Sequence, residues 1–208
     1  MEIRRTANAG ILLKLDDIEI LLDGVCREVK PYLATPQAEK EKLSSCWPDV
    51  VAFTHAHEDH FDESYARDYS CATGRKVVSQ KLTVGQVTVT PVFTRHMGHW
   101  GLTTPHQSFV IEGSQRVWFL GDASPSQMKQ FAPFPKPDVL IVPYPYICTD
   151  MALKVLESYL PCKIVLLHLP LQENDPDGIW QTAAPGMEQL KAFLYVPQIG
   201  ETLNFLNL

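Results

Sequence analysis

A strand-like apolar run leads directly into a group of histidines and acids at residues 50–60, which read VVAFTHAHEDH. His55 and His57 alternate on an extended backbone, so they reach one cation only if the chain bends as it leaves the strand. Asp59 and His60 come from the turn that follows and point to a second position. Because these imidazoles and the carboxylate would leave repulsion and unpaired donors without a cation, the cluster predicts a metal site.

Three more strand-like runs end in a histidine or an aspartate. These ends are His96 after residues 87–94, Asp122 after 117–120, and His168 after 164–167. Five of the seven histidines belong to this pattern, and we place the other two, His99 and His106, in the loop after His96. Since ligand sites of α/β proteins lie at the carboxyl ends of strands, we expect these groups to meet at one edge of the fold.

The number of candidate ligands favours two metal ions. Four imidazoles and two carboxylates, with His168 as a fifth imidazole, exceed what one tetrahedral zinc ion takes. Asp122 stands alone at its strand end and is the natural carboxylate to bridge the two ions. Zn²⁺ is the default metal, with Mn²⁺ and Fe²⁺ as alternatives, because the set holds no thiolate and affinity alone does not select the metal.

These residues resemble the metallo-β-lactamase superfamily of metal-dependent hydrolases. Residues 55–60 match its H-x-H-x-D-H signature, the later ligands follow in the family's order, and the leading hairpin ends in a matching Ile20-Leu21-Leu22-Asp23. The resemblance implies a four-layer αβ/βα sandwich. It implies one metal held by His55, His57 and His96, and another held by Asp59, His60 and His168, with Asp122 bridging. His99 remains an alternative to His96.

Within the superfamily, the chain is similar in overall shape to the small L-ascorbate-6-phosphate lactonase-like hydrolases. Those proteins commonly carry a Gly-His pair near the start, where this chain has Asn8-Ala9-Gly10, so the lactone substrate is not carried over. The oxygen-reducing di-iron branch has an acid where this chain has His57, which argues against that branch.

The resemblance implies a hydrolase in which a hydroxide held between two divalent ions attacks a carbonyl carbon or a phosphorus. The substrate would be a small, anionic ester, lactone, thioester or phosphodiester. Asp59 would bind metal and accept a hydrogen bond from the attacking hydroxide, while Asp23 is either an orienting group or a plain turn residue. Two alternatives stay open: a mononuclear iron redox enzyme acting on a sulfur compound, and a catalytically silent member that binds a ligand.

The loop after His96 and the segment after the apolar run 139–142 are the expected walls of the substrate pocket. Trp100, Tyr144 and Tyr146 are either pocket residues or ordinary core and rim aromatics. The candidate polar contacts are Arg95 for an anion and His99 in the same loop.

The rest of the pattern predicts an α/β or α+β fold with many short strands. The continuous apolar runs at 50, 139 and 164 indicate strands covered on both faces, and Lys76–Val78 is a further strand-like run. We expect helices capped at Thr35, opened by a capping box at Ser124–Gln127, spanning Thr149–Leu160 with Met151 on its apolar face, and beginning near Pro185.

With 208 residues the chain has the length of one domain, which we place at 1–208. Its formal charge of −6 speaks against a general nucleic-acid binder, and its apolar runs are too short to span a bilayer. Five cysteines without a C-x-x-C pair, and no secretory signal, indicate a reduced cytoplasmic protein. The expected partner is a small-molecule substrate, and the oligomeric state is left open.

Overall fold

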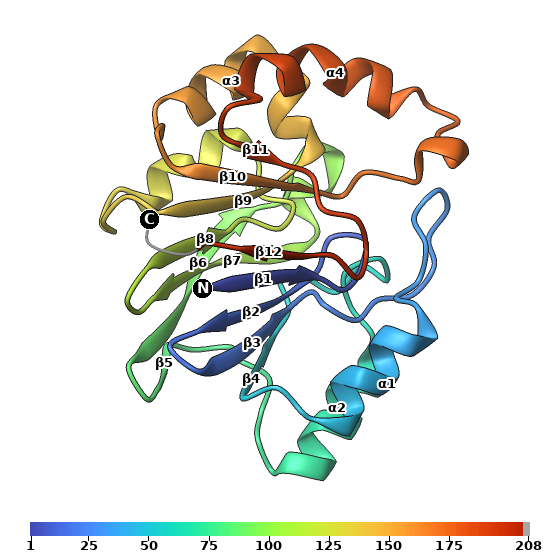
Figure 1. The fold of residues 1–208 in the computed structure, drawn as a ribbon, viewed down its shortest axis with the longest axis vertical. Helices are drawn as coiled ribbons and strands as arrows, with labels where there is room; N and C mark the ends of the chain where they lie inside the picture. The colour runs from blue at the N-terminus through green and yellow to red at the C-terminus, as the bar shows by residue number, and fades with distance from the viewer. Residues whose placement is uncertain (206–208) are drawn as a thin grey trace.

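The computed structural model describes residues 1–205, without the side chain of Trp100, and arranges them as two sheets with helices outside (Figure 1). The first sheet has the order β12-β1-β2-β3-β4. Its strands are β1 (Glu2–Arg5), β2 (Ile11–Leu15), β3 (Ile18–Leu22), β4 (Val50–Ala52) and β12 (Thr202–Asn204). The first three strands are antiparallel neighbours, and β4 joins β3 in parallel.

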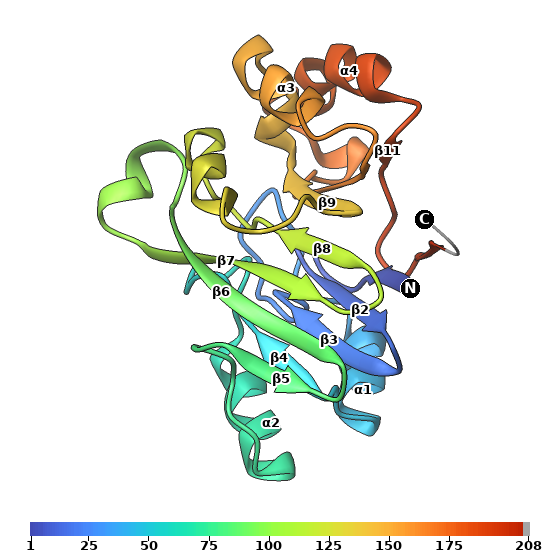
Figure 2. The same cartoon turned by 90° about the vertical axis from the view of Figure 1, so that its left-hand side faces the viewer.

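The second sheet has the order β11-β10-β9-β8-β7-β6-β5. Its strands are β5 (Leu82–Val84), β6 (Val87–Arg95), β7 (Pro105–Glu112), β8 (Arg116–Phe119), β9 (Val139–Pro143), β10 (Lys163–Leu167) and β11 (Leu194–Tyr195). The strands from β8 to β11 run parallel to one another, and those from β5 to β8 are antiparallel (Figure 2).

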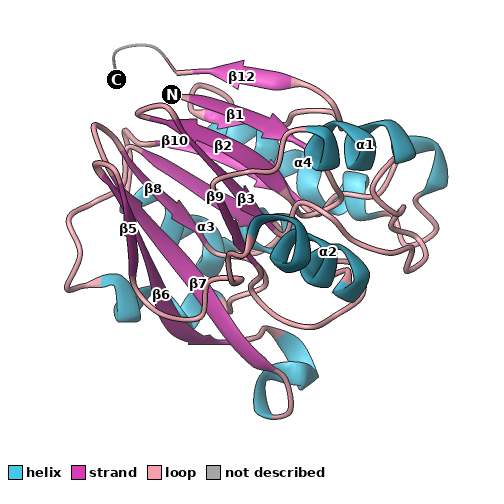
Figure 3. Ribbon diagram, turned by 90° about the horizontal axis from the view of Figure 1, so that it is seen from below, coloured by secondary structure: helices cyan, strands magenta, loops and turns pink. Residues whose placement is uncertain are grey.

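Two helices cover each sheet on its outer side (Figure 3). Helices α1 (Gln37–Ser45) and α2 (Glu63–Thr73) pack on the first sheet, while α3 (Asp150–Glu157) and α4 (Ile179–Leu190) pack on the second. Four short 3-10 helices complete the fold: η1 (Gly98–Leu102), η2 (Pro125–Phe131), η3 (Tyr144–Ile147) and η4 (Gln172–Asn174). None of the described helices is long and apolar enough to cross a bilayer.

Three apolar cores separate the four layers. The central core lies between the sheets and includes Ile20 of β3 and Ile141 of β9. Leu21 and Val51 turn to the opposite face of the first sheet and pack against Tyr69 of α2. A third core, including Leu140, lies between the second sheet and α3 and α4. Successive side chains of one strand thus pack into two different cores. The apolar runs at 50, 139 and 164 predicted such strands, covered on both faces. The expected four-layer αβ/βα sandwich is confirmed.

Two helix starts differ from the sequence interpretation because a side chain finds another partner. Thr35 is not the cap of α1: its hydroxyl accepts the backbone N–H of Cys26 at 2.9 Å, and the helix begins at Gln37 after Pro36. Helix α4 begins at Ile179, with Pro185 inside it. The carboxylate of Asp175 accepts the first N–H groups of that helix, which is the role of a helix cap.

The capping box at Ser124 was wrong for a tertiary reason. Ser124 makes no side-chain cap bond, and the segment forms the 3-10 helix η2. The backbone N–H of Ser124 donates to the carbonyl of Arg95, and the side chain of Gln127 accepts the N–H of Arg95. Both residues of the expected capping box are therefore hydrogen-bonded to the end of β6.

Two further expectations fail on packing. Met151 is 71% exposed, because α3 buries Ala152 and Leu153 together with Leu156, and of these only Leu156 was expected on the apolar face. Lys76–Val78 forms no strand, although the N–H of Val78 donates to the carbonyl of Val51.

Candidate metal centre

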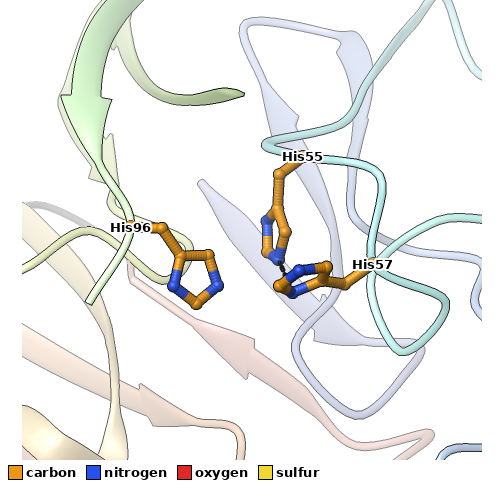
Figure 4. Close-up of side chains that lie close together, drawn as sticks. All are labelled: His55, His57 and His96. Atoms are coloured by element: carbon orange, nitrogen blue, oxygen red, sulfur yellow. Dashed lines mark hydrogen bonds between the residues drawn. The ribbon is translucent and has the colours of Figure 1, made fainter. Parts of the chain in front are cut away.

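Four strand ends meet where the two sheets lie together. The loop after β4 carries His55, His57, Asp59 and His60, and the chain after β6, β8 and β10 carries His96, Asp122 and His168. Figure 4 shows His55 and His57 on one loop, with the His96 ring facing them from the end of β6. The structure therefore brings together all seven candidate ligands.

The first group consists of His55, His57 and His96, whose ligand atoms lie within 4.8 Å of one another. Nε2 of His55 lies 3.0 Å from Nδ1 of His57. Rings of His55 and His57 stand 4.8 and 4.9 Å from the His96 ring, centroid to centroid. This is the geometry of three imidazoles around a common point.

The second group consists of Asp59, His60 and His168, and it satisfies the same 4.8 Å limit. Nε2 of His168 lies 3.2 Å from the Asp59 carboxylate and 3.1 Å from Nε2 of His60. Two imidazole nitrogens so close share either a hydrogen or a cation between them.

Asp122 lies between the two groups. Its Oδ2 is 3.4 Å from Nε2 of His96 in the first group, and 3.5 and 3.6 Å from Nε2 of His60 and His168 in the second. One carboxylate oxygen thus reaches side chains of both groups.

Hydrogen bonds at the outer nitrogens determine which imidazole nitrogen faces the cluster. Nδ1 of His96 lies 2.7 Å from the carbonyl of Met97, which only accepts, so Nδ1 carries the hydrogen. Nδ1 of His60 likewise donates to the Asp23 carboxylate at 2.8 Å. In both residues the Nε2 lone pair is left for a ligand, and Asp23 has the orienting role.

Thr54 orients His55 in the same way. Its hydroxyl donates to the Asp23 carboxylate at 2.6 Å and therefore accepts from Nδ1 of His55, 2.9 Å away. His55 is thereby set with its Nε2 lone pair toward His57.

The donor set fits a divalent cation. Nε2 of His96 and Oδ1 of Asp122 are buried and have no hydrogen-bond partner, although buried polar atoms are normally satisfied. A cation satisfies an imidazole lone pair and a carboxylate oxygen together, and no hydrogen-bond donor stands in its place in the described part of the cluster.

Burial and neighbouring charges set the ionisation of the cluster. Burial lowers the pKa of His55, and nearby His60 lowers it further, so this imidazole stays neutral. Burial alone would raise the pKa of Asp122, but His168 and His60 hold it well below its usual range. Asp122 therefore stays ionised, and against the effect of burial it raises the pKa of His60 and His96. A metal ion binds an ionised carboxylate and unprotonated imidazole nitrogens, so its binding here would release protons.

The backbone is strained at this edge. Asp23 and His168 have positive φ angles of 48° and 64°, a region that residues other than glycine rarely occupy. Gly121, at φ 53°, lies so close to Thr54 that a Cβ would stand 2.6 Å from its methyl carbon. Such strain is concentrated at functional sites, where the surrounding fold maintains it.

The sequence interpretation missed His106, which lies in β7 and not in a loop. Its Nε2 accepts the backbone N–H of Asp122 at 3.0 Å, and its Nδ1 lies 2.8 Å from the hydroxyl of Thr94. Burial lowers the pKa of His106 to about 3. Only the pairing of β6 with β7, which sets Thr94 opposite His106, could have revealed this position.

A cleft of about 530 Å³ opens over the cluster, lined among others by Tyr144, Met97 and Tyr32. Of the expected substrate contacts whose side chains are described, only Tyr144 lines it. Arg95 and His99 are exposed, and Tyr146 is fully buried in the core. The side chain of Trp100 lies outside the described part of the structure. Tyr32, which sequence reasoning did not select, contacts the His168 ring at 4.4 Å between centroids.

Comparisons with known proteins agree with this fold. Structures similar over 99% of both chains are a possible metal-dependent hydrolase from Veillonella parvula (TM-score 0.74, 15% identity) and an isothiocyanate hydrolase from Delia radicum gut bacteria (TM-score 0.70, 17% identity). A diiron β-hydroxylase from Streptomyces venezuelae has a TM-score of 0.65 at 12% identity, over 98% of this chain and 54% of that one. At such identities the likeness shows the fold alone.

A search of curated proteins found no match. The family model described as the beta-lactamase superfamily domain matches residues 3–154, which include six of the seven residues of the cluster. Because that match spans well over half of the chain, this protein belongs to the beta-lactamase superfamily, whose fold implies divalent metal binding.

Proposed function

We propose that this protein is a hydrolase that uses two divalent metal ions, with Zn²⁺ as the first choice and Mn²⁺ or Fe²⁺ as alternatives. His55, His57 and His96 would hold one ion, and Asp59, His60 and His168 the other. The observation that carries the proposal is the place of Asp122, whose Oδ2 lies within 3.6 Å of imidazoles from both groups.

A bound divalent ion lowers the pKa of water and stabilises negative charge that develops on the substrate. Asp59 lines the cleft beside His168 and is placed to accept a hydrogen bond from the attacking water. The hydroxyls of Tyr32 and Tyr144 stand at the cleft wall. Burial raises the pKa of both tyrosines, so both hydroxyls stay protonated. Because the two side chains are hydrogen-bonded to each other, one hydroxyl hydrogen is left to donate to an oxyanion.

The expected substrate is a small ester, lactone, thioester or phosphodiester with an anionic group. The likeness to an isothiocyanate hydrolase adds isothiocyanates to the compounds worth testing. Membership of the lactonase-like branch and a cytoplasmic location stay predictions.

The fold is shared with a diiron β-hydroxylase, but the redox alternative uses a single iron, so this likeness does not favour it. The full set of five imidazoles and two carboxylates suits hydrolysis better than the single iron of that alternative. It also weighs against a silent, ligand-binding member, since the ligand set is complete.

Metal analysis combined with an activity screen tests the proposal. We expect about two equivalents of zinc or manganese per chain, and hydrolysis of at least one compound in a panel of phosphodiesters, lactones, thioesters and isothiocyanates. His57→Ala should abolish that activity with the fold retained, whereas His99→Ala, a matched change on the exposed loop, should not. One equivalent of iron without hydrolysis, or full hydrolysis in the His57 variant, would overturn it.

A further inference from the structure

A second cavity, of about 520 Å³, adjoins the cleft over the metal cluster. Tyr32 lines both hollows and so forms the wall between them. The loop after β3 and the loop after β10 meet beside this cavity (Figure 1), where the Asn174 side chain donates to the carbonyl of Pro31.

Arg5, at the end of β1, lines this cavity and is only 7% exposed. Its guanidinium donates to four backbone carbonyls, those of Ala7, Asn8, Pro197 and Leu169. Carbonyl oxygens satisfy hydrogens but carry no net charge. Within residues 1–205, no carboxylate lies within 4.0 Å of the guanidinium, so its positive charge has no ionic partner.

This charge persists at neutral pH. Burial lowers the pKa of Arg5 to about 10, which still leaves the group a cation. A buried cation without a counter-charge is costly, and an anion could approach this one from the cavity that Arg5 lines.

Asn8 provides the second, independent observation. It also lines the cavity and is 3% exposed, yet its side-chain Nδ2 has no hydrogen-bond partner. A buried amide donor without an acceptor costs about 1–3 kcal/mol. An oxyanion beside Arg5 would supply both the missing acceptor and the missing charge.

The other walls define what carries the oxyanion. Trp180 and Leu171 line the cavity with apolar surface, and the acid Glu173 is exposed at the rim. An anion is therefore favoured at the buried floor and disfavoured at the rim, while an apolar group fits between them.

We propose that this cavity binds a carboxylate or phosphate group carried on an apolar scaffold, and that this group is the non-reacting end of the substrate. The inference rests on the proposed hydrolase for its second half. The carbonyl of Asn8 accepts the N–H of His168 at 3.2 Å, so a ligand at Asn8 lies beside the second metal group. Binding by the cavity itself does not depend on hydrolysis.

Benzoate and phenyl phosphate are suitable probes, with benzamide as the neutral isostere of benzoate. Binding is followed by quenching of Trp180 fluorescence, which is identified as the difference from Trp180→Phe. We expect saturable quenching by one of the two anions below roughly 10 mM, and none by benzamide. Tighter binding of benzoate would identify a carboxylate as the group that the cavity binds, and tighter binding of phenyl phosphate would identify a phosphate.

Asn8→Asp places a carboxylate of equal size beside Arg5 and should weaken anion binding by at least about tenfold. Gln86→Glu makes the same charge change on an exposed turn and should leave binding unchanged. His57→Ala removes a metal ligand and should retain the quenching, which separates this cavity from the metal cluster.

Equal binding of benzamide and benzoate, absence of quenching with both anions, or loss of quenching in His57→Ala would overturn the proposal. The comparison of benzoate with benzamide uses the unaltered protein, so it decides the matter even if Asn8→Asp fails to fold. If the anion binds but no panel compound is hydrolysed, the cavity stands and the proposed hydrolase fails.

Discussion

The backbone N–H of Asp122 donates a hydrogen bond to Nε2 of His106, and the two nitrogens lie 3.0 Å apart. Nδ1 of His106 therefore carries the hydrogen and donates to the Thr94 hydroxyl. The Thr94 hydroxyl in turn donates to the Ser108 hydroxyl, which donates to the carbonyl of Leu120. The backbone of Asp122, whose carboxylate lies near both ligand groups, is thus held by a chain of hydrogen bonds through β6 and β7 in which every donor is determined.

His106→Leu should weaken metal binding, because it leaves the N–H of Asp122 without an acceptor. We expect a loss of about 10- to 100-fold in metal affinity and of about 1–3 kcal/mol in the free energy of unfolding. Competition with a chromophoric chelator measures the affinity. His106→Gln, which keeps an acceptor, should restore part of it, and an unchanged affinity in His106→Leu would contradict the role assigned to this residue.

Asp23→Asn should also weaken metal binding. Asp23 accepts the N–H and hydroxyl of Thr54 and the Nδ1 hydrogen of His60. An amide keeps one acceptor oxygen, so the orientation of His60 is lost and metal affinity should fall by about 10- to 100-fold. Asp17→Asn, in the exposed turn before β3, makes the same charge change and should alter nothing in the chelator assay.

The choice between His96 and His99 has a direct test. Nε2 of His96 faces Asp122 at 3.4 Å, whereas His99 is exposed on η1. His96→Ala should lower the number of metal ions bound per chain, and His99→Ala should not, by elemental analysis after dialysis. The reverse pattern would make His99 the ligand.

Gly121→Ala should destabilise the protein more than Gly74→Ala. Both glycines have positive φ, 53° and 70°, so each alanine costs about 1–2 kcal/mol. An added Cβ meets nothing within 4 Å at Gly74, but at Gly121 it meets Thr54 at 2.6 Å. This steric overlap should lower the free energy of unfolding of Gly121→Ala by roughly a further 1–3 kcal/mol, as measured by denaturant unfolding. Equal losses in the two variants would show that Thr54 yields without cost.

Stability should fall in acid partly through Glu39, which receives two hydrogen bonds from Arg4. The hydrogen bond from Arg4 lowers the pKa of Glu39 in the folded state. Its contribution is therefore complete above the unfolded pKa, about 4.3, and is lost as pH falls through the lower folded value.

Glu39→Gln should lower the free energy of unfolding at pH 7 by about 1 kcal/mol, since Arg4 remains partly exposed to solvent. It should also flatten the dependence of that free energy on pH below about 4.3. Glu41→Gln, at an exposed position of the same helix, serves as the control and should retain the wild-type dependence.

The strand ends that bear ligands were readable because each strand-like run is followed within a few residues by a histidine or an aspartate. Phe53 lies two residues before His55, and Leu167 directly precedes His168, so the local pattern alone predicts the type of site. Cover on both faces of β9 followed from the same pattern, since its apolar run is continuous. The four-layer arrangement followed from the resemblance to the superfamily.

What the sequence by itself determined is the set of ligand types and the mixed α/β or α+β class of fold, because both depend on neighbours along the chain. Only the tertiary structure decided that Thr94 faces His106, that Arg95 turns away from the cleft, and that Arg5 lies buried beside Asn8. The reason is physical: these relations depend on strand register and on hydrogen bonds between distant segments, and a shift of one residue in register would turn each side chain to the opposite face.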